Sequence, residues 1–103
     1  MIPKLQALRP QIAALCRQFQ VRRLDLFGSA LDVGQFEPDR SDVDLLVEFG
    51  QLPPGTYADH YFGLQEALAA LLDRPVDLVV ERAIRNPYFR AGVEASRELL
   101  YAA

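Results

Sequence analysis

Two apolar runs, at residues 24–27 and 42–49, constrain the fold of this chain more than any other feature of the sequence. The second run alternates apolar and polar residues, the period of a strand with one buried face. Alternate residues of a strand share a face, so Asp42 and Asp44 project together, with Cα atoms about 6.5 Å apart. Two carboxylates at that spacing can converge on a hard divalent cation or on a pair of metal ions. The pattern therefore predicts a metal site that handles phosphate groups.

The remaining periodicity predicts three helices and a third strand. Apolar residues three and four positions apart mark an amphipathic helix near the N-terminus, which either kinks at Pro10 or begins there. A segment dense in proline and glycine predicts a loop after the second strand. An Asn-Pro pair offers a cap and a first position for the last helix. The predicted elements are helices at 5–19, 57–73 and 86–100 and strands at 24–27, 42–49 and 76–80.

This order of helix, strand, irregular linker, strand, helix, strand and helix predicts an α+β fold with helices packed on a small mixed sheet in two layers. The 103 residues are expected to form a single domain, residues 1–103, with room for a core and one site. The order of the strands in the sheet does not follow from the pattern. Arg22 and Arg23 are interpreted as a solvated turn before the first strand, with the alternative that they help to hold phosphate near an anion site. The arginines around the last helix are interpreted as a solvated face: Arg82, Arg85, Arg90 and Arg97.

The composition excludes some classes of function. Eleven basic and 14 acidic residues give a net charge of −3, the wrong sign for a protein that binds nucleic acid by neutralising phosphates. No apolar run is long enough for a membrane span or a secretion signal, so a cytoplasmic protein with no membrane partner is expected. Cys16 and His60 are the only residues of their kinds, which excludes a zinc site of the usual Cys/His type. Any metal must be bound mainly by carboxylates.

A third carboxylate, Asp77, lies inside the β-branched run at residues 76–80. A carboxylate inside a buried strand is costly unless it is paired or bound to metal, so Asp77 points to a cation. The alternative is that Asp77 faces solvent at a sheet edge.

The pair Gly28 and Ser29, at the end of the first run, adds a place for phosphate to this acidic set. A glycine lets the backbone approach a triphosphate, and Ser29 offers a backbone N–H and a hydroxyl to its outer phosphates. Each signal alone is weak, since Gly-Ser is mostly a turn and Asp-x-Asp mostly a solvated edge. Together with three carboxylates that can hold two Mg²⁺ ions, they indicate a phosphoryl-transfer site.

The chain resembles the minimal nucleotidyltransferase (MNT) domains of the DNA polymerase β-like superfamily. The resemblance covers most of the chain and rests on Gly28-Ser29, Pro38-Asp39, Ser41–Phe49, Phe62–Gln65 and Arg74–Val79. It implies the nucleotidyltransferase fold, two Mg²⁺ ions and ATP as substrate. It also implies that Asp42 and Asp44 bind both metals, while Asp77 completes the site and helps to activate the attacking hydroxyl, so that all three are catalytic.

The resemblance further implies a protein partner. A chain of this length is expected to lack an acceptor-binding domain, so the acceptor hydroxyl is expected on a separate protein. MNT domains of this kind point to a HEPN-family toxin of the HepT type, which is neutralised when AMP is placed on its tyrosine. The chain would then be the antitoxin of the pair.

Two departures from the MNT pattern leave another hypothesis open. The loop at residues 30–41 is slightly longer than in many MNT domains, and Leu31-Asp32 replaces an arginine often found soon after the Gly-Ser pair. Arg40 could supply a compensating cation to the nucleotide. The alternative is an MNT module with weak or no catalysis, which binds nucleotide and neutralises its partner by occupancy.

Overall fold

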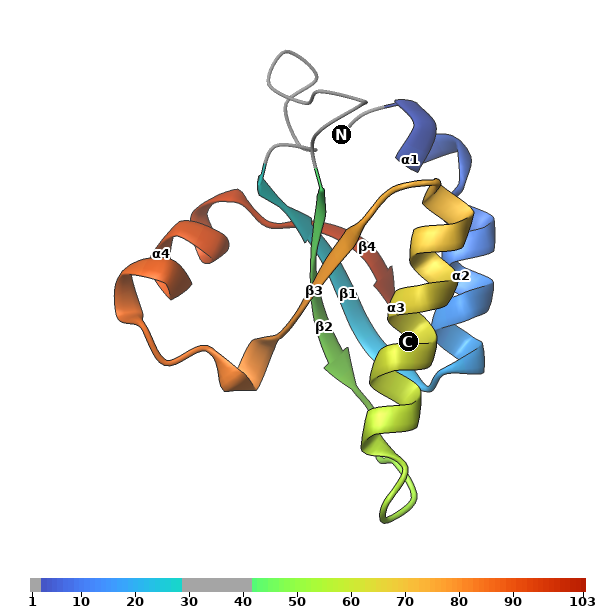
Figure 1. Ribbon diagram of the computed structural model, residues 1–103. Helices are drawn as coiled ribbons and strands as arrows, with labels where there is room; N and C mark the ends of the chain where they lie inside the picture. Colours follow the sequence, from blue (N-terminus) through green and yellow to red (C-terminus); the bar gives the residue numbers. More distant parts are fainter. Residues whose placement is uncertain (1–2, 29–41) are drawn as a thin grey trace.

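The computed structural model describes residues 3–28 and 42–103, and these residues form helices on both faces of a sheet (Figure 1). The chain order is α1 (Pro3–Ala7), α2 (Arg9–Gln18), β1 (Val21–Phe27), β2 (Val43–Phe49), α3 (Tyr57–Leu72), β3 (Val76–Val80), the 3₁₀ turn η2 (Glu81–Ala83), α4 (Pro87–Ser96) and β4 (Glu98–Ala102). No helix among the described residues is long and apolar enough to cross a bilayer.

The four strands form one mixed sheet in the order β3-β2-β1-β4. β1 runs antiparallel to both β2 and β4, whereas β2 and β3 are parallel. A parallel pair needs a long crossover, and α3 supplies it. This arrangement confirms the predicted α+β fold with a small mixed sheet.

Each face of the sheet carries its own apolar cluster, because successive strand residues point to opposite faces. The larger cluster lies between the sheet and α1, α2 and α3, and it includes Leu24, Leu45 and Leu68. The smaller cluster lies on the other face, where η2 and α4 cover part of the sheet (Figure 1). It consists of Phe27, Leu46, Ile84 and Val93, with Val79 at its margin.

The predicted helix boundaries are partly right. α1 and α2 are separate helices, and Pro10 lies in the first turn of α2, as one of the two predicted alternatives required. Asn86 caps α4 as predicted, since its side-chain oxygen accepts hydrogen bonds from the backbone N–H groups of Tyr88 and Phe89 at 2.9 and 3.1 Å.

The prediction that the last helix extends to residue 100 is wrong. α4 ends at Ser96, and residues 98–102 form β4 along the free edge of β1. This pairing satisfies backbone N–H and C=O groups that β1 would otherwise expose, a gain that no local propensity of the segment reveals. Within β4, Leu100 is buried and the two residues before it, Glu98 and Leu99, are exposed, so the segment carries no clear period-two signal.

Candidate functional site

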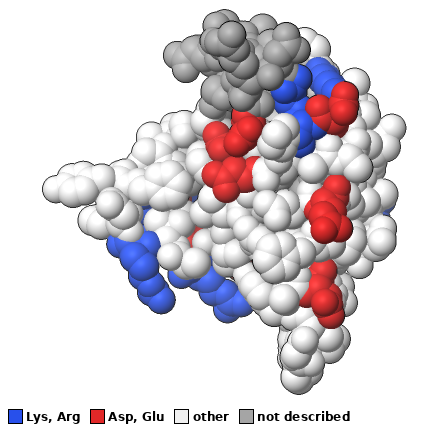
Figure 2. Space-filling view, viewed as in Figure 1, with Lys and Arg blue, Asp and Glu red and all other residues white. Residues whose placement is uncertain are grey.

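The three predicted aspartates gather at one end of the sheet. Asp44 on β2 pairs in register with Asp77 on β3, and both lie on the face that carries the smaller apolar cluster. Asp42 is exposed and comes directly before β2. Figure 2 shows acidic side chains grouped in the upper centre of this view. The parallel pairing of β2 with β3 therefore brings together carboxylates that are 33 residues apart in the sequence.

Gly28 lies next to this group of carboxylates, directly after the end of β1, the strand that pairs with β2. Phe27, the last residue of β1, lies opposite Asp44, so Gly28 follows beside that carboxylate. Gly28 has a φ of +78°, a left-handed conformation that glycine adopts without steric cost. A Cβ atom on Gly28 would overlap the Oδ2 atom of Asp44. The absence of a side chain at Gly28 thus leaves room for the Asp44 carboxylate, while the predicted approach of this backbone to a triphosphate stays a prediction.

Replacement of Gly28 by alanine is expected to destabilise the chain more than replacement of Gly55. Both glycines have positive φ, at +78° and +80°, so both variants carry backbone strain of about 1–3 kcal/mol. Only at Gly28 does the new methyl group meet another side chain, because no atom lies within 4 Å of the corresponding position on Gly55. Urea denaturation of the two variants measures the difference. Equal losses in the two variants would mean that Asp44 moves aside without cost.

The electrostatics of the site favour a cation. Burial raises the pKa of the Asp44 carboxyl, and the charges of Asp77 and Asp42 raise this pKa further. The mutual repulsion of three carboxylates is what a bound divalent ion would relieve. Asp44 is also the only one of the three that is partly buried, so it is the member of the set with the most fixed environment.

The carboxylates do not form a closed ligand set in this structure. Within residues 3–28 and 42–103, no three His, Cys, Asp or Glu side chains converge closely enough to hold a metal ion. The raised pKa of Asp44 is compatible with this absence of a closed ligand set, because a charge influences a neighbouring pKa over longer distances than those of metal coordination. The exposed side chains of Asp42 and Asp77 have room to turn towards an ion beside Asp44.

The raised pKa of Asp44 predicts that Asp44→Asn stabilises the metal-free chain at neutral pH. The folded state holds the carboxyl proton more tightly than the unfolded state, whose pKa is about 3.9. Stability is therefore lost as the pH rises from about 4 through the folded-state pKa, and the neutral amide avoids that loss. Thermal melts in EDTA should show a higher melting temperature for the variant at pH 7, with the gap narrowing towards pH 4. A gap that does not depend on pH would point to packing instead.

Three sequence-based interpretations need correction or lie outside the described part. Asp77 is not in an internal strand but is exposed on the edge strand β3, as the alternative reading proposed, so burial gives no argument for its metal. Ser29 and Arg40, predicted to bind nucleotide, lie outside the described residues. Of the predicted site residues, the structure thus brings together Gly28, Asp42, Asp44 and Asp77.

The sequence reasoning missed an ion-pair network beneath the site. The carboxylate of Asp25 on β1 is fully buried and accepts hydrogen bonds from Arg97 Nε at 2.7 Å and Arg23 Nε at 2.8 Å. Arg97 also binds Glu81 and Glu94, so this guanidinium ties β1 to η2 and α4. Burial opposes ionisation of Asp25, but the hydrogen bonds from Arg97 and Arg23 outweigh it and lower the pKa.

The interpretation of Arg97 as a solvated residue is therefore wrong, whereas Arg23 is exposed as predicted but is not in a turn. The side chain of Arg97 is only 11% exposed, and Arg23 lies within β1 rather than in a turn before it. The signal that could have revealed the network is Asp25 itself, an acidic residue between Leu24 and Leu26 in the first apolar run.

The site and fold match a known family. A family model described as a nucleotidyltransferase domain matches residues 8–100. A Methanocaldococcus jannaschii protein, provisionally named a protein adenylyltransferase, is 36% identical over 91% of this chain and 89% of its own length. The protein adenylyltransferase MntA of Thermococcus cleftensis is 38% identical over 70% of this chain and 68% of its own.

Solved structures share the fold. One, provisionally described as a minimal nucleotidyltransferase, superposes with a TM-score of 0.71 at 32% identity and covers 91% of this chain and 90% of its own. Another, a toxin-antitoxin structure with AMP-PNP, gives a TM-score of 0.67 at 25% identity over 92% of this chain and 73% of its own. The chain thus belongs to the nucleotidyltransferase domain family, as its resemblance to MNT domains predicted.

Proposed function

We propose that the chain is a Mg²⁺-dependent protein adenylyltransferase that transfers AMP from ATP to a hydroxyl of a HEPN-family toxin of the HepT type, and so acts as its antitoxin. The observation that carries this proposal is the pairing of Asp44 with Asp77 beside Gly28 in a nucleotidyltransferase domain. Two relatives are named as protein adenylyltransferases, and a structural relative is a toxin-antitoxin pair with AMP-PNP, which supports both the nucleotide and the class of partner.

The residues of the site fit two Mg²⁺ ions. Oxygen ligands suit this hard cation, and the carboxylate repulsion that raises the Asp44 pKa would fall when an ion binds. Asp42 and Asp44 would hold the ions, and Asp77 would complete the ion nearest the acceptor. When bound, the ions neutralise charge on the triphosphate and lower the pKa of the attacking hydroxyl.

The chain's own groups then position the reactants. The acceptor oxygen attacks the α-phosphorus of ATP, the bond from that phosphorus to the bridging oxygen of pyrophosphate breaks, and Asp77 receives the hydroxyl proton. Gly28, whose backbone passes close to the Asp44 carboxylate, is proposed to let the chain approach the triphosphate. Ser29 and Arg40 are proposed to bind its outer phosphates, Ser29 through its N–H and hydroxyl and Arg40 through its charge.

The test is transfer to the partner. The chain is incubated with ATP, Mg²⁺ and a HEPN-family protein of the HepT type, and intact mass is measured. We expect one or more added adenylyl groups on the partner, and none when EDTA replaces Mg²⁺. A partner that keeps its mass with every nucleotide, yet is bound and silenced, would establish the binding module instead, the alternative favoured by the replacement of an arginine by Leu31-Asp32.

A further inference from the structure

Large apolar side chains are exposed close together on one side of the molecule. Tyr57 and Phe62 on α3 are 41% and 57% exposed, and Tyr88 and Phe89 on α4 are 87% and 43% exposed. Scattered apolar residues are normal on a protein surface, but a contiguous group of this kind marks a contact site. Among the described residues, Leu99 is the remaining large apolar side chain of similar exposure, and it lies on β4, at the opposite edge of the sheet from β3.

A groove of about 580 Å³ is lined by three of these aromatic residues, Tyr57, Phe62 and Phe89. Tyr57, Tyr61 and Phe62 of α3 line one side, and Ile84 and Phe89 line the other. The edge strand β3 contributes Val79 and Val80 to the same groove. In Figure 2 the uncharged area between α3 and α4 corresponds to this part of the fold. Its width between two helices suits a single apolar segment of another protein.

The groove leads to the catalytic carboxylates. Val79 in its lining is two residues after Asp77 on the same face of β3, about 6.5 Å along the strand. Tyr61 connects the two regions, because it lines the groove and its hydroxyl donates a hydrogen bond to the carbonyl of Leu78, the residue after Asp77. This hydrogen bond fixes α3 against the edge strand β3. A segment of a partner protein that binds in this groove therefore lies beside Asp77, the residue proposed to receive the proton of the acceptor hydroxyl.

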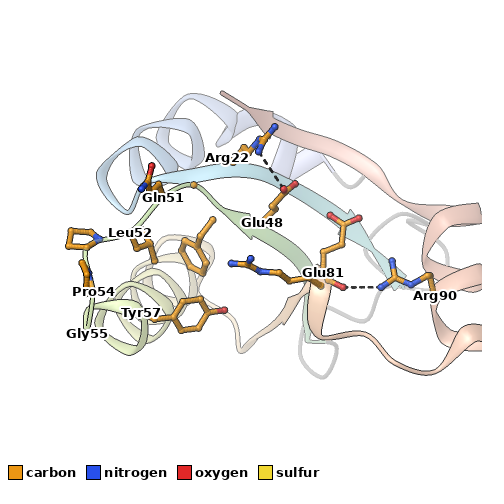
Figure 3. A pocket seen from close by; sticks show the side chains of 13 residues that line it. Arg22, Glu48, Gln51, Leu52, Pro54, Gly55, Tyr57, Glu81 and Arg90 are labelled. Atoms are coloured by element: carbon orange, nitrogen blue, oxygen red, sulfur yellow. Dashed lines mark hydrogen bonds and ion pairs between the residues drawn. The ribbon is translucent and has the colours of Figure 1, made fainter.

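The rim of the groove is basic although the whole chain is acidic. Residues 81–90 contain three arginines and one glutamate, and that glutamate, Glu81, pairs with Arg97. Arg85 is the charged residue in the groove lining, while Arg82 and Arg90 line a neighbouring hollow of about 950 Å³ that shares Tyr57 with it (Figure 3). Arg22, Glu48 and Glu81 also line that hollow, so basic residues outnumber acidic ones there. The positive rim therefore favours an acidic flank on the segment that enters the groove.

We propose that this groove docks an amphipathic helix of the partner protein, with an apolar face against the aromatic residues and acidic side chains along the arginine rim. Docking delivers the partner's acceptor hydroxyl to Asp77. The delivery step rests on the proposed adenylyl transfer, whereas the docking step stands on the groove and its charges alone.

The experiment compares two surface variants with matched controls. Phe62→Ser removes an exposed groove side chain, and Leu99→Ser removes an exposed apolar side chain on β4. Arg85→Glu reverses a rim charge, and Arg17→Glu reverses an exposed charge on α2. Affinity for a HEPN-family protein of the HepT type is measured by calorimetry at 50 and 300 mM salt. The ATP-induced shift in melting temperature is measured on each variant.

Phe62→Ser and Arg85→Glu should each weaken partner binding at least tenfold, with the Arg85 effect shrinking at high salt, while both controls bind as wild type. All four variants should keep the ATP-induced shift. Binding unaffected by the groove variants, or a wild-type chain that does not bind this partner, would overturn the proposal. Loss of the ATP shift in Phe62→Ser would assign the groove to nucleotide and also overturn it. Weakened binding in a system where wild type transfers no AMP would support docking and refute only the proposed transfer.

Discussion

Replacing Arg97 with alanine should lower the free energy of unfolding by about 3–5 kcal/mol, because it leaves a buried carboxylate short of its main partner. Asp25 is fully buried, and without Arg97 its charge would be met only by Arg23, whose side chain is 44% exposed. The loss would also release Glu81 and Glu94 from the same guanidinium. Since small domains are stable by about 5–15 kcal/mol, this change is a large fraction of the total.

The control for this prediction is the ion pair of Arg22 with Glu48. It spans 3.9 Å between side chains that are 71% and 40% exposed, so Arg22→Ala should change stability by no more than about 1 kcal/mol. Urea denaturation of both variants gives the comparison. A loss below about 1 kcal/mol for Arg97→Ala would show that water or Arg23 compensates Asp25 fully.

The pH dependence of the same network has a definite sign. The pKa of Asp25 is lowered in the folded state, so its contribution to stability is present above the unfolded-state pKa of about 3.9. That contribution is lost as the pH falls through the lower folded-state pKa. Between pH 4 and pH 2 the Arg97→Ala variant should therefore lose less stability than wild type.

The apolar and β-branched runs were sufficient to predict β2, β3 and the second part of β1, because one face of each strand is buried in the larger cluster. β1 begins at Val21, three residues before the predicted strand. The order of strands was not predictable, and this is why the environment of Asp77 was misjudged. A β-branched run has the same sequence pattern in an internal strand and in an edge strand, and β3 is an edge strand. β4 was missed for a related reason, since its partner β1 lies more than 70 residues earlier.

The parts of the site that depend on distant residues were the least predictable. Asp25 and Arg97 are 72 residues apart, and only the pairing of β4 with β1 brings them into contact. The docking groove likewise combines α3, β3 and α4, so no single segment carries its signal. The gathering of the three carboxylates was predictable because Asp42 directly precedes the strand that carries Asp44 and a family motif supplied Asp77. Local patterns thus identified residues that the fold brings together, while the fold determined what surrounds them.

Asp77→Asn should reduce adenylyl transfer to the partner by about 1000-fold or more while the chain still binds ATP. In the proposed mechanism Asp77 binds the ion nearest the acceptor and receives the proton of the acceptor hydroxyl. Its loss should remove several kcal/mol of transition-state stabilisation, which corresponds to a rate loss of about 1000-fold. Asp44 neighbours both other carboxylates, so Asp44→Asn should remove transfer and also the Mg²⁺-dependent binding of ATP.

The matched control is Asp73→Asn, at an exposed left-handed position that asparagine tolerates, after α3 and four residues before Asp77. Single-turnover transfer followed by intact mass, together with melting curves in ATP and Mg²⁺, separates the two roles. If Asp77→Asn loses ATP binding as completely as Asp44→Asn does, Asp77 belongs to the nucleotide's metal site rather than to the acceptor's.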